Sequence, residues 1–132
     1  MASIVALSEA ASIGLHSMVL IAKSKEVLNV GQIAEKICSS RHHVAKIMQR
    51  LAKQGFVTSN RGPNGGFTLR KSAKETSLLD IYEAIEGKLD VEICPGGKEV
   101  CPFDKCILGD ISTRISIEIK DYFQKKTLSD YL

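Results

Sequence analysis

Three cysteines lie close together in the segment CPGGKEVCPFDKC. They are Cys94, Cys101 and Cys106, separated by six residues and then by four. Cysteine thiolates bind zinc and iron-sulfur clusters, so three of them in one loop could hold a metal group. The spacing is too wide for a thioredoxin-like CxxC motif and lacks the paired knuckles of a zinc finger. A closed site would therefore need a fourth ligand from elsewhere in the protein.

The length and the N-terminal sequence indicate one small cytoplasmic domain. At 132 residues with 44% hydrophobic content, the chain can bury one modest core. The apolar N-terminus lacks a basic leading region and is interrupted by Glu9 and His16. It therefore predicts neither a signal peptide nor a membrane-spanning helix, and we expect no membrane partner. In a reducing cytoplasm four cysteines are poor candidates for structural disulfides, which favours metal, cluster or redox chemistry.

The charge is distributed unevenly along the chain. The net charge is only +3, and residues 75–132 hold seven basic and twelve acidic side chains. Residues 41–74, in contrast, hold eight basic side chains and no Asp or Glu. Such a segment attracts polyanions, because its cations neutralise phosphates and release counterions. The alternative interpretation is an ordinary solvated surface whose acids lie elsewhere.

Apolar periodicity and capping residues predict three helices in the N-terminal part of the chain. Ser8 can cap a first, apolar helix. The segment VGQIAEKI, residues 30–37, predicts a second, short helix. Ser39 or Ser40 can cap a third helix that runs to Gly55. Two short helices joined by a tight turn are typical of a helix-turn-helix.

The rest of the chain predicts a β-hairpin, a fourth helix and a long terminal helix. The segment FVTSNRGPNGGFTLRK has two strand-like runs around a turn rich in Gly, Pro and Asn, which is typical of a wing. Residues 77–86 predict the fourth helix, the cysteine loop follows, and the last helix is expected to begin near Ile107. Its apolar seam, which a symmetry mate could cover, consists of Leu108, Ile111, Ile115, Ile119 and Tyr122.

These elements predict a mainly α fold with a small β-hairpin. We expect a winged helix-turn-helix with a long C-terminal dimerisation helix, and therefore a homodimer. Residues 1–75 would form the DNA-binding region. Residues 76–132 would form the cysteine loop and the dimerisation helix, packed with the first helix as a single domain. Cys38 is expected to pack in the helix-turn-helix core as a small apolar residue.

The second helix of a helix-turn-helix places its N-terminal side chains in the major groove of DNA. Arg41 suits bidentate contact with a guanine. Arg61, at the tip of the wing, suits a narrowed minor groove, where the negative potential is greatest. Adjacent histidines on a helix point in different directions, which favours DNA contact over a shared metal ion for His42 and His43. The residues expected to bind double-stranded DNA are Ser39, Ser40, Arg41, His42, His43, Lys46, Arg50, Arg61, Gly62 and Pro63.

The helix-turn-helix, the motif RLAKQGFVTSNRGPNGGF and the three cysteines together resemble a bacterial family of iron-sulfur transcription regulators, typified by IscR, NsrR and RsrR. The resemblance extends from LSEAASIGLH to the closing TLSDYL. It implies a homodimer, usually a repressor, that binds operators of approximate two-fold symmetry and senses redox, nitric oxide or iron-sulfur status. It also implies that Cys94, Cys101 and Cys106 bind a [2Fe-2S] or [4Fe-4S] cluster, although their spacing is less even than is common in the family.

The same resemblance gives candidates for the fourth ligand. Family members can take it from the first helix of the partner subunit, as an acid or a histidine. Aligning LSEAASIGLH with the family places His16 where RsrR has a ligating histidine, and Ser12 where some relatives have an acid. His16 is therefore the first candidate and Glu9 the second. A lone histidine on a largely apolar helix can alternatively be a core or interface residue.

Other classes of function compete with this interpretation. Some members of the family regulate without a cluster, and the three cysteines could instead form a structural zinc site or a redox-active thiol site. A winged helix can also bind protein without touching DNA. An enzyme is not expected, because nothing in the sequence resembles a nucleotide-binding fingerprint, a catalytic triad or a paired acid site.

Overall fold

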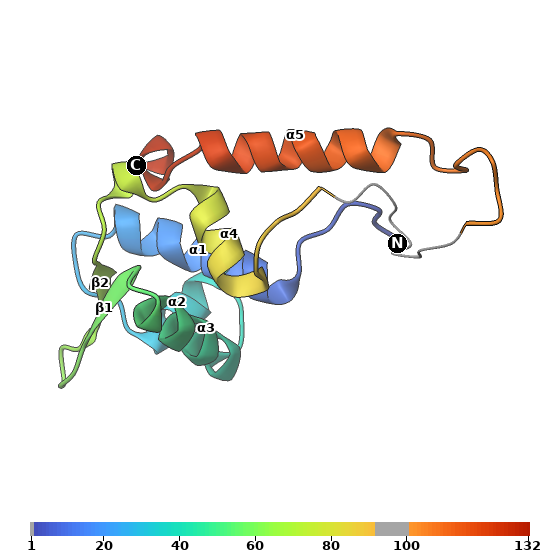
Figure 1. Cartoon of the computed structure of the whole chain (residues 1–132). Helices are drawn as coiled ribbons and strands as arrows, with labels where there is room; N and C mark the ends of the chain where they lie inside the picture. The colour runs from blue at the N-terminus through green and yellow to red at the C-terminus, as the bar shows by residue number, and fades with distance from the viewer. Residues whose placement is uncertain (1, 92–100) are drawn as a thin grey trace.

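The structure, a computed structural model, describes residues 2–91 and 101–132. Cys94 therefore lies outside the described residues. Within them, the helices and one antiparallel hairpin follow the predicted order (Figure 1). The helices are α1 (Glu9–Lys23), α2 (Val30–Ile37), α3 (Arg41–Lys53), α4 (Leu78–Glu86) and α5 (Ile111–Lys125); the strands are β1 (Val57–Asn60) and β2 (Gly66–Leu69); the short 3-10 helices are η1 (Ala73–Glu75) and η2 (Leu128–Tyr131).

The helix-turn-helix consists of α2 and α3, and each of these helices begins at a side-chain cap. Asn29 and Gln32 cap α2 reciprocally: the N–H of Gln32 donates to Asn29 Oδ1 at 2.8 Å, and the N–H of Asn29 donates to Gln32 Oε1 at 2.9 Å. Ser40, one of the two predicted candidates, caps α3 by accepting from the N–H of His43 at 3.1 Å. Such caps satisfy amides that a helix leaves unpaired, so they fix where α3 starts.

The core forms where α1 packs against α3 and α4. Met18 of α1, Met48 of α3 and Ile81 of α4 are fully buried. Gly14 allows α1 and α4 to approach closely, since a Cβ atom at this position would clash with Ile85. The helix-turn-helix is therefore attached to the rest of the protein by apolar packing.

The wing is an antiparallel hairpin in which Val57 pairs with Leu69 and Asn60 with Gly66. Its base is tied to the segment before α2, because the N–H of Phe67 donates to the carbonyl of Leu28 at 2.7 Å. The wing is thus held beside the start of α2, and it points away from the side of the molecule on which α5 lies (Figure 1).

The last helix begins at Ile111, so the predicted start near Ile107 was wrong. Residues 107–110 form a turn in which Gly109 has a φ of 59°. Left-handed backbone interrupts a right-handed helix, and Gly109 adopts it at little cost. Leu108 consequently precedes α5 and does not belong to the apolar seam of the helix.

Cys38 is exposed, so the prediction that it packs in the core was wrong. It ends α2 in the left-handed conformation, with φ 55° and ψ 45°, and its N–H donates to the carbonyl of Glu35 at 3.3 Å. This conformation turns the chain sharply toward α3. Ile33, Val44 and Met48 fill the helix-turn-helix core instead.

Replacing Cys38 with glycine is expected to stabilise the fold by roughly 0.5–1 kcal/mol. A residue with a Cβ atom is strained in left-handed backbone, whereas glycine is not, and part of this gain is offset by the greater freedom of glycine in the unfolded chain. Denaturant unfolding measures the difference. Cys38→Ala is the matched control: it removes the thiol but keeps the Cβ atom, so its stability should stay near that of the wild type. Equal stabilisation by both substitutions would contradict the argument.

No helix within residues 2–91 and 101–132 is long and apolar enough to cross a membrane.

Candidate nucleic-acid interface and cysteine site

The first turns of α3 are solvent-exposed on the side of the molecule that carries the wing (Figure 1). Within the described part of the chain, none of the arginines or lysines predicted to bind DNA forms an ion pair with a carboxylate. Their positive charge is thus not neutralised by a contacting acid and is available to an anion. The exposed basic side chains concerned are Arg41, Lys46, Arg50 and Arg61.

Arg61 lies at the tip of the wing, as predicted, beside the exposed Gly62 and Pro63. The tip is a tight turn: the N–H of Gly65 donates to the carbonyl of Gly62 at 2.9 Å. A Cβ atom at Gly65 would clash with the carbonyl of Asn60, so the turn requires glycine there. Gly62 has a φ of 111°, a backbone conformation that glycine adopts at little cost. The loop therefore presents Arg61 on a short, well-defined support.

Arg41 points back toward α2. A Cβ atom at Gly31 would lie 2.8 Å from Nη2 of Arg41 and 3.1 Å from its Cζ. The guanidinium thus lies over the first turn of α2. It lines an open groove between the start of α2 and the wing, together with Asn29, Asn60 and Arg61.

His43, in contrast, contacts α1 of the same subunit. Its Nδ1–H donates to Glu9 Oε1 at 3.2 Å, which ties α3 to the start of α1. Both side chains are more than half exposed, so this contact contributes little to stability. Ser39 is partly buried and lines a groove with Lys36 and α1. His42 is exposed. Of the α3 side chains predicted to bind DNA, those that are exposed and form no ion pair with a carboxylate of the described residues are Arg41, His42, Lys46 and Arg50.

His16 is exposed on α1, and one of its ring nitrogens already has a partner. Nδ1 lies 2.7 Å from the carbonyl oxygen of Ser12. A carbonyl only accepts, so Nδ1 carries the hydrogen and the neutral ring keeps its lone pair on Nε2. Metal-binding histidines commonly have this arrangement, with one nitrogen bonded to a backbone carbonyl and the other on the metal. The orientation of His16 therefore suits binding of a metal group through Nε2.

Cys101 and Cys106 are free, exposed thiols, and Cys94 lies outside the described residues. Among residues 2–91 and 101–132 no three Cys, His, Asp or Glu side chains form a metal-binding group. His16 is thus not assembled with Cys101 and Cys106 in one subunit. Soft thiolates together with an imidazole are a donor set that iron-sulfur clusters and zinc both accept. The donor chemistry fits such a group.

One side of α5 carries exposed apolar side chains. No residue of this helix is buried, and Ile111 and Tyr122, which share one side of it, are 44% and 51% exposed. The C-terminal end of α5 is held to η2, where a hydrogen bond with Tyr122 raises the pKa of Tyr131 above its ordinary value. Exposed apolar side chains on one side of a helix are a candidate surface for interaction with another protein.

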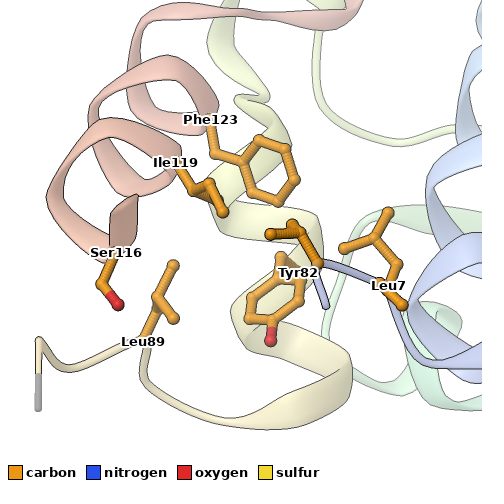
Figure 2. Close-up of a pocket in the computed structure, with 8 residues that line it drawn as sticks. Leu7, Tyr82, Leu89, Ser116, Ile119 and Phe123 are labelled. Atoms are coloured by element: carbon orange, nitrogen blue, oxygen red, sulfur yellow. The ribbon is translucent and has the colours of Figure 1, made fainter. Parts of the chain in front are cut away.

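An apolar groove separates α5 from α4 and the segment before α1. Figure 2 shows Tyr82 of α4 facing Phe123 of α5, and their ring centroids are 5.8 Å apart. Leu7, Leu89 and Ile119 also line the groove, with Leu7 and Leu89 at its two sides in this view. This groove continues the apolar surface of α5 toward the N-terminal segment.

Sequence reasoning missed Gly31, Asn29 and Asn60 as part of the candidate interface. Asn29 has a signal in the sequence, since Asn followed three residues later by Gln predicts a capping box. Asn60 lies in the predicted wing, directly before Arg61. Gly31 has no signal, because it meets Arg41 only through tertiary packing.

Comparisons with known proteins agree with this architecture. The model of the Rrf2 family, described as iron-dependent transcriptional regulators, matches residues 7–132. The HTH-type transcriptional regulator IscR of Pectobacterium carotovorum is 30% identical over 101 residues, which are 76% of this chain and 62% of that protein. The chain therefore spans less than two thirds of the length of this relative.

Two solved structures share the fold. CymR, the global cysteine regulator of B. subtilis, superposes with a TM-score of 0.77 over 96% of this chain and 95% of CymR, at 24% identity. The oxidised form of CymR from Staphylococcus aureus superposes with a TM-score of 0.71 over 94% of this chain and 93% of that structure, at 25% identity. The predicted winged helix-turn-helix fold is confirmed.

Proposed function

Because the chain belongs to the Rrf2 family of transcriptional regulators, we propose that it is a homodimeric, DNA-binding repressor controlled by an iron-sulfur cluster. The family is one of regulators rather than enzymes, as the sequence predicted. The observation that carries DNA binding is the exposed basic surface of α3 and the wing, whose arginines and lysines contact no carboxylate within residues 2–91 and 101–132. Phosphate contacts from such a surface account for most non-specific affinity.

The geometry of the helix-turn-helix suggests how each element would meet DNA. The N-terminal part of α3 would enter the major groove, with His42 and Lys46 facing the duplex. Arg61 would reach the adjacent minor groove from the wing. Two copies related by a two-fold axis would place two α3 helices on successive turns of the duplex, which calls for an operator of approximate two-fold symmetry.

The cysteines and His16 are the residues that we propose hold the cluster. Cys94, Cys101 and Cys106 would supply three thiolates, and His16 of the partner subunit the fourth donor. A bound cluster would supply redox chemistry whose potential depends on hydrogen bonding and solvent exposure at the site. Ser12 orients His16 through its carbonyl, so the imidazole presents Nε2 without first changing its tautomer. Two subunits would share each site. Binding of the cluster would therefore favour one distance between the two α3 helices over others.

A cluster-free regulator is the second candidate. The likeness to CymR of S. aureus, of which an oxidised form exists, and the exposed, free thiols of Cys101 and Cys106 favour it. Exposed thiols can undergo oxidation or disulfide exchange, and three of them could also hold a structural zinc. Anaerobically purified protein separates the candidates: a coloured protein with iron and sulfide supports the cluster, and a colourless one supports thiol or zinc chemistry.

Binding to duplex DNA should weaken steeply as salt rises, and Arg61→Ala should weaken it further by roughly tenfold. The substitution removes one guanidinium from the wing, so the slope of log affinity against log salt should also fall by about one for each bound subunit. Fluorescence anisotropy with a labelled duplex at several salt concentrations measures both quantities.

Lys125→Ala is the control for this experiment. Lys125 is an exposed cation on α5, and it pairs with Asp121 at 2.9 Å. Its removal should leave the affinity and the salt slope unchanged. A wild type that shows no salt-dependent binding would refute the proposed function. If Arg61→Ala bound the duplex with wild-type affinity and salt slope, only the proposed contact of the wing with DNA would be refuted.

A further inference from the structure

The contact with Gly31 holds the guanidinium of Arg41 away from the N-terminus of α3. Arg41 is the first residue of this helix, yet its guanidinium lies over the first turn of α2. A Cβ atom at residue 31 would come within 2.8 Å of Nη2, which is closer than non-bonded carbon and nitrogen atoms approach. The guanidinium can therefore lie at this place only because residue 31 is glycine.

The groove that receives this guanidinium has the chemistry of an anion site. Its walls come from α2, α3 and the wing, and they include the guanidinium groups of Arg41 and Arg61 and the side chains of Asn29 and Asn60, with no Asp or Glu. Neither arginine has an ion-pair partner among the described residues. Guanidinium groups bind phosphate oxygens strongly through parallel N–H donors.

The direction of Arg41 distinguishes a phosphate contact from a base contact. In a helix-turn-helix the second helix meets base edges with its N-terminal residues, while the first helix crosses the sugar-phosphate backbone. A guanidinium that lies on the first helix is therefore directed toward the backbone. We propose that Arg41 binds a DNA phosphate in the groove between α2 and the wing, and that Gly31 is the positioning residue that seats it there. This inference rests on the proposed DNA binding.

Gly31 acts on affinity rather than on folding. The two atoms nearest to a methyl group at residue 31 belong to the far end of the flexible Arg41 side chain, which can move aside without disturbing the core. The third is Asn29 Oδ1 at 3.3 Å, which has to shift by only a few tenths of an ångström. Alanine also forms helices more readily than glycine. The expected signature of Gly31→Ala is thus weaker DNA binding in a protein whose thermal midpoint is not lowered.

A double-mutant cycle tests the pair. The probe is a fluorescein-labelled, mixed-sequence duplex of about 30 base pairs, which spans two half-sites one helical turn apart. Arg41→Ala should weaken binding to this duplex roughly tenfold and lower the salt slope by about one per bound subunit. Gly31→Ala should reproduce part of both effects. Gly31→Ala in the Arg41→Ala background should have no further effect, because no guanidinium is left to displace.

Distinct outcomes would overturn the inference. If Gly31→Ala bound the duplex with wild-type affinity, the position of the Arg41 guanidinium over residue 31 would be unimportant for binding. Independent, multiplying losses in the double variant would show that Gly31 acts through the fold instead of through Arg41. Unchanged mixed-sequence binding by Arg41→Ala would mean that Arg41 reads a base. Absence of salt-dependent binding by the wild type is a different failure, since it refutes the proposed function before any substitution is made.

Discussion

Cys101→Ala should lose the iron-sulfur cluster. The proposed site has four donors, of which this thiolate is one, and removal of even an outer-shell partner of a metal ligand costs about 10–100-fold in metal affinity. Loss of a thiolate that binds the cluster directly should lower the affinity by more than this, so iron and sulfide should fall to background. Visible absorption with iron and sulfide analysis after anaerobic reconstitution measures the loss. His16→Ala in the same assay should retain less cluster than the wild type, because its Nε2 would be the fourth donor.

Cys38→Ala is the matched control for the loss of colour. It also removes one exposed thiol, but from the turn between α2 and α3. It should therefore load iron and sulfide as the wild type does. A coloured Cys101→Ala protein would exclude Cys101 as a ligand. A colourless wild type that carries zinc would replace the cluster with the second candidate.

The sequence predicted those parts of the fold that depend on local signals. The bounds of α2 were predicted to the residue from one amphipathic segment, and Ser40 was one of two candidate caps for α3. The wing followed from its cluster of glycines and Pro63, since few other conformations suit that composition. These signals lie within a few residues of the structure that they determine.

The sequence did not predict features in which a residue's conformation or its contact partner depends on distant parts of the chain. Cys38 was assigned by its chemistry to the core, but its position at the end of α2 requires left-handed backbone and turns it outward. The contact of His43 with Glu9 joins residues 34 positions apart. The seating of Arg41 on Gly31 likewise depends on how α2 packs against α3. Neither contact leaves a periodic trace in the sequence.

Ile111→Glu is expected to convert the protein to a monomer and to weaken duplex binding by about 100-fold or more. Ile111 begins α5 and is 44% exposed in the single chain, and it lies on the same side of the helix as Ile115 and Tyr122, in the apolar face that we propose a second copy covers. A carboxylate buried there without a partner would be costly to desolvate. Two linked half-site contacts gain about 10²–10⁴ in affinity over one, and a monomer forfeits that gain. Sedimentation measures the oligomeric state, and anisotropy with the duplex measures the affinity.

The fold of the Ile111→Glu monomer should survive, because exposed substitutions usually change stability by within about 0.5 kcal/mol. Circular dichroism checks that the variant is folded, which distinguishes loss of the dimer interface from unfolding. Gln124→Glu is the matched control: it adds the same charge to an exposed, polar position of α5 and should leave the dimer intact. A dimeric Ile111→Glu protein would place the interface elsewhere. A wild type that is monomeric and still binds the duplex tightly would contradict the dimer. The apolar face of α5 would then be a surface for a different partner, because large exposed apolar patches usually mark interaction sites.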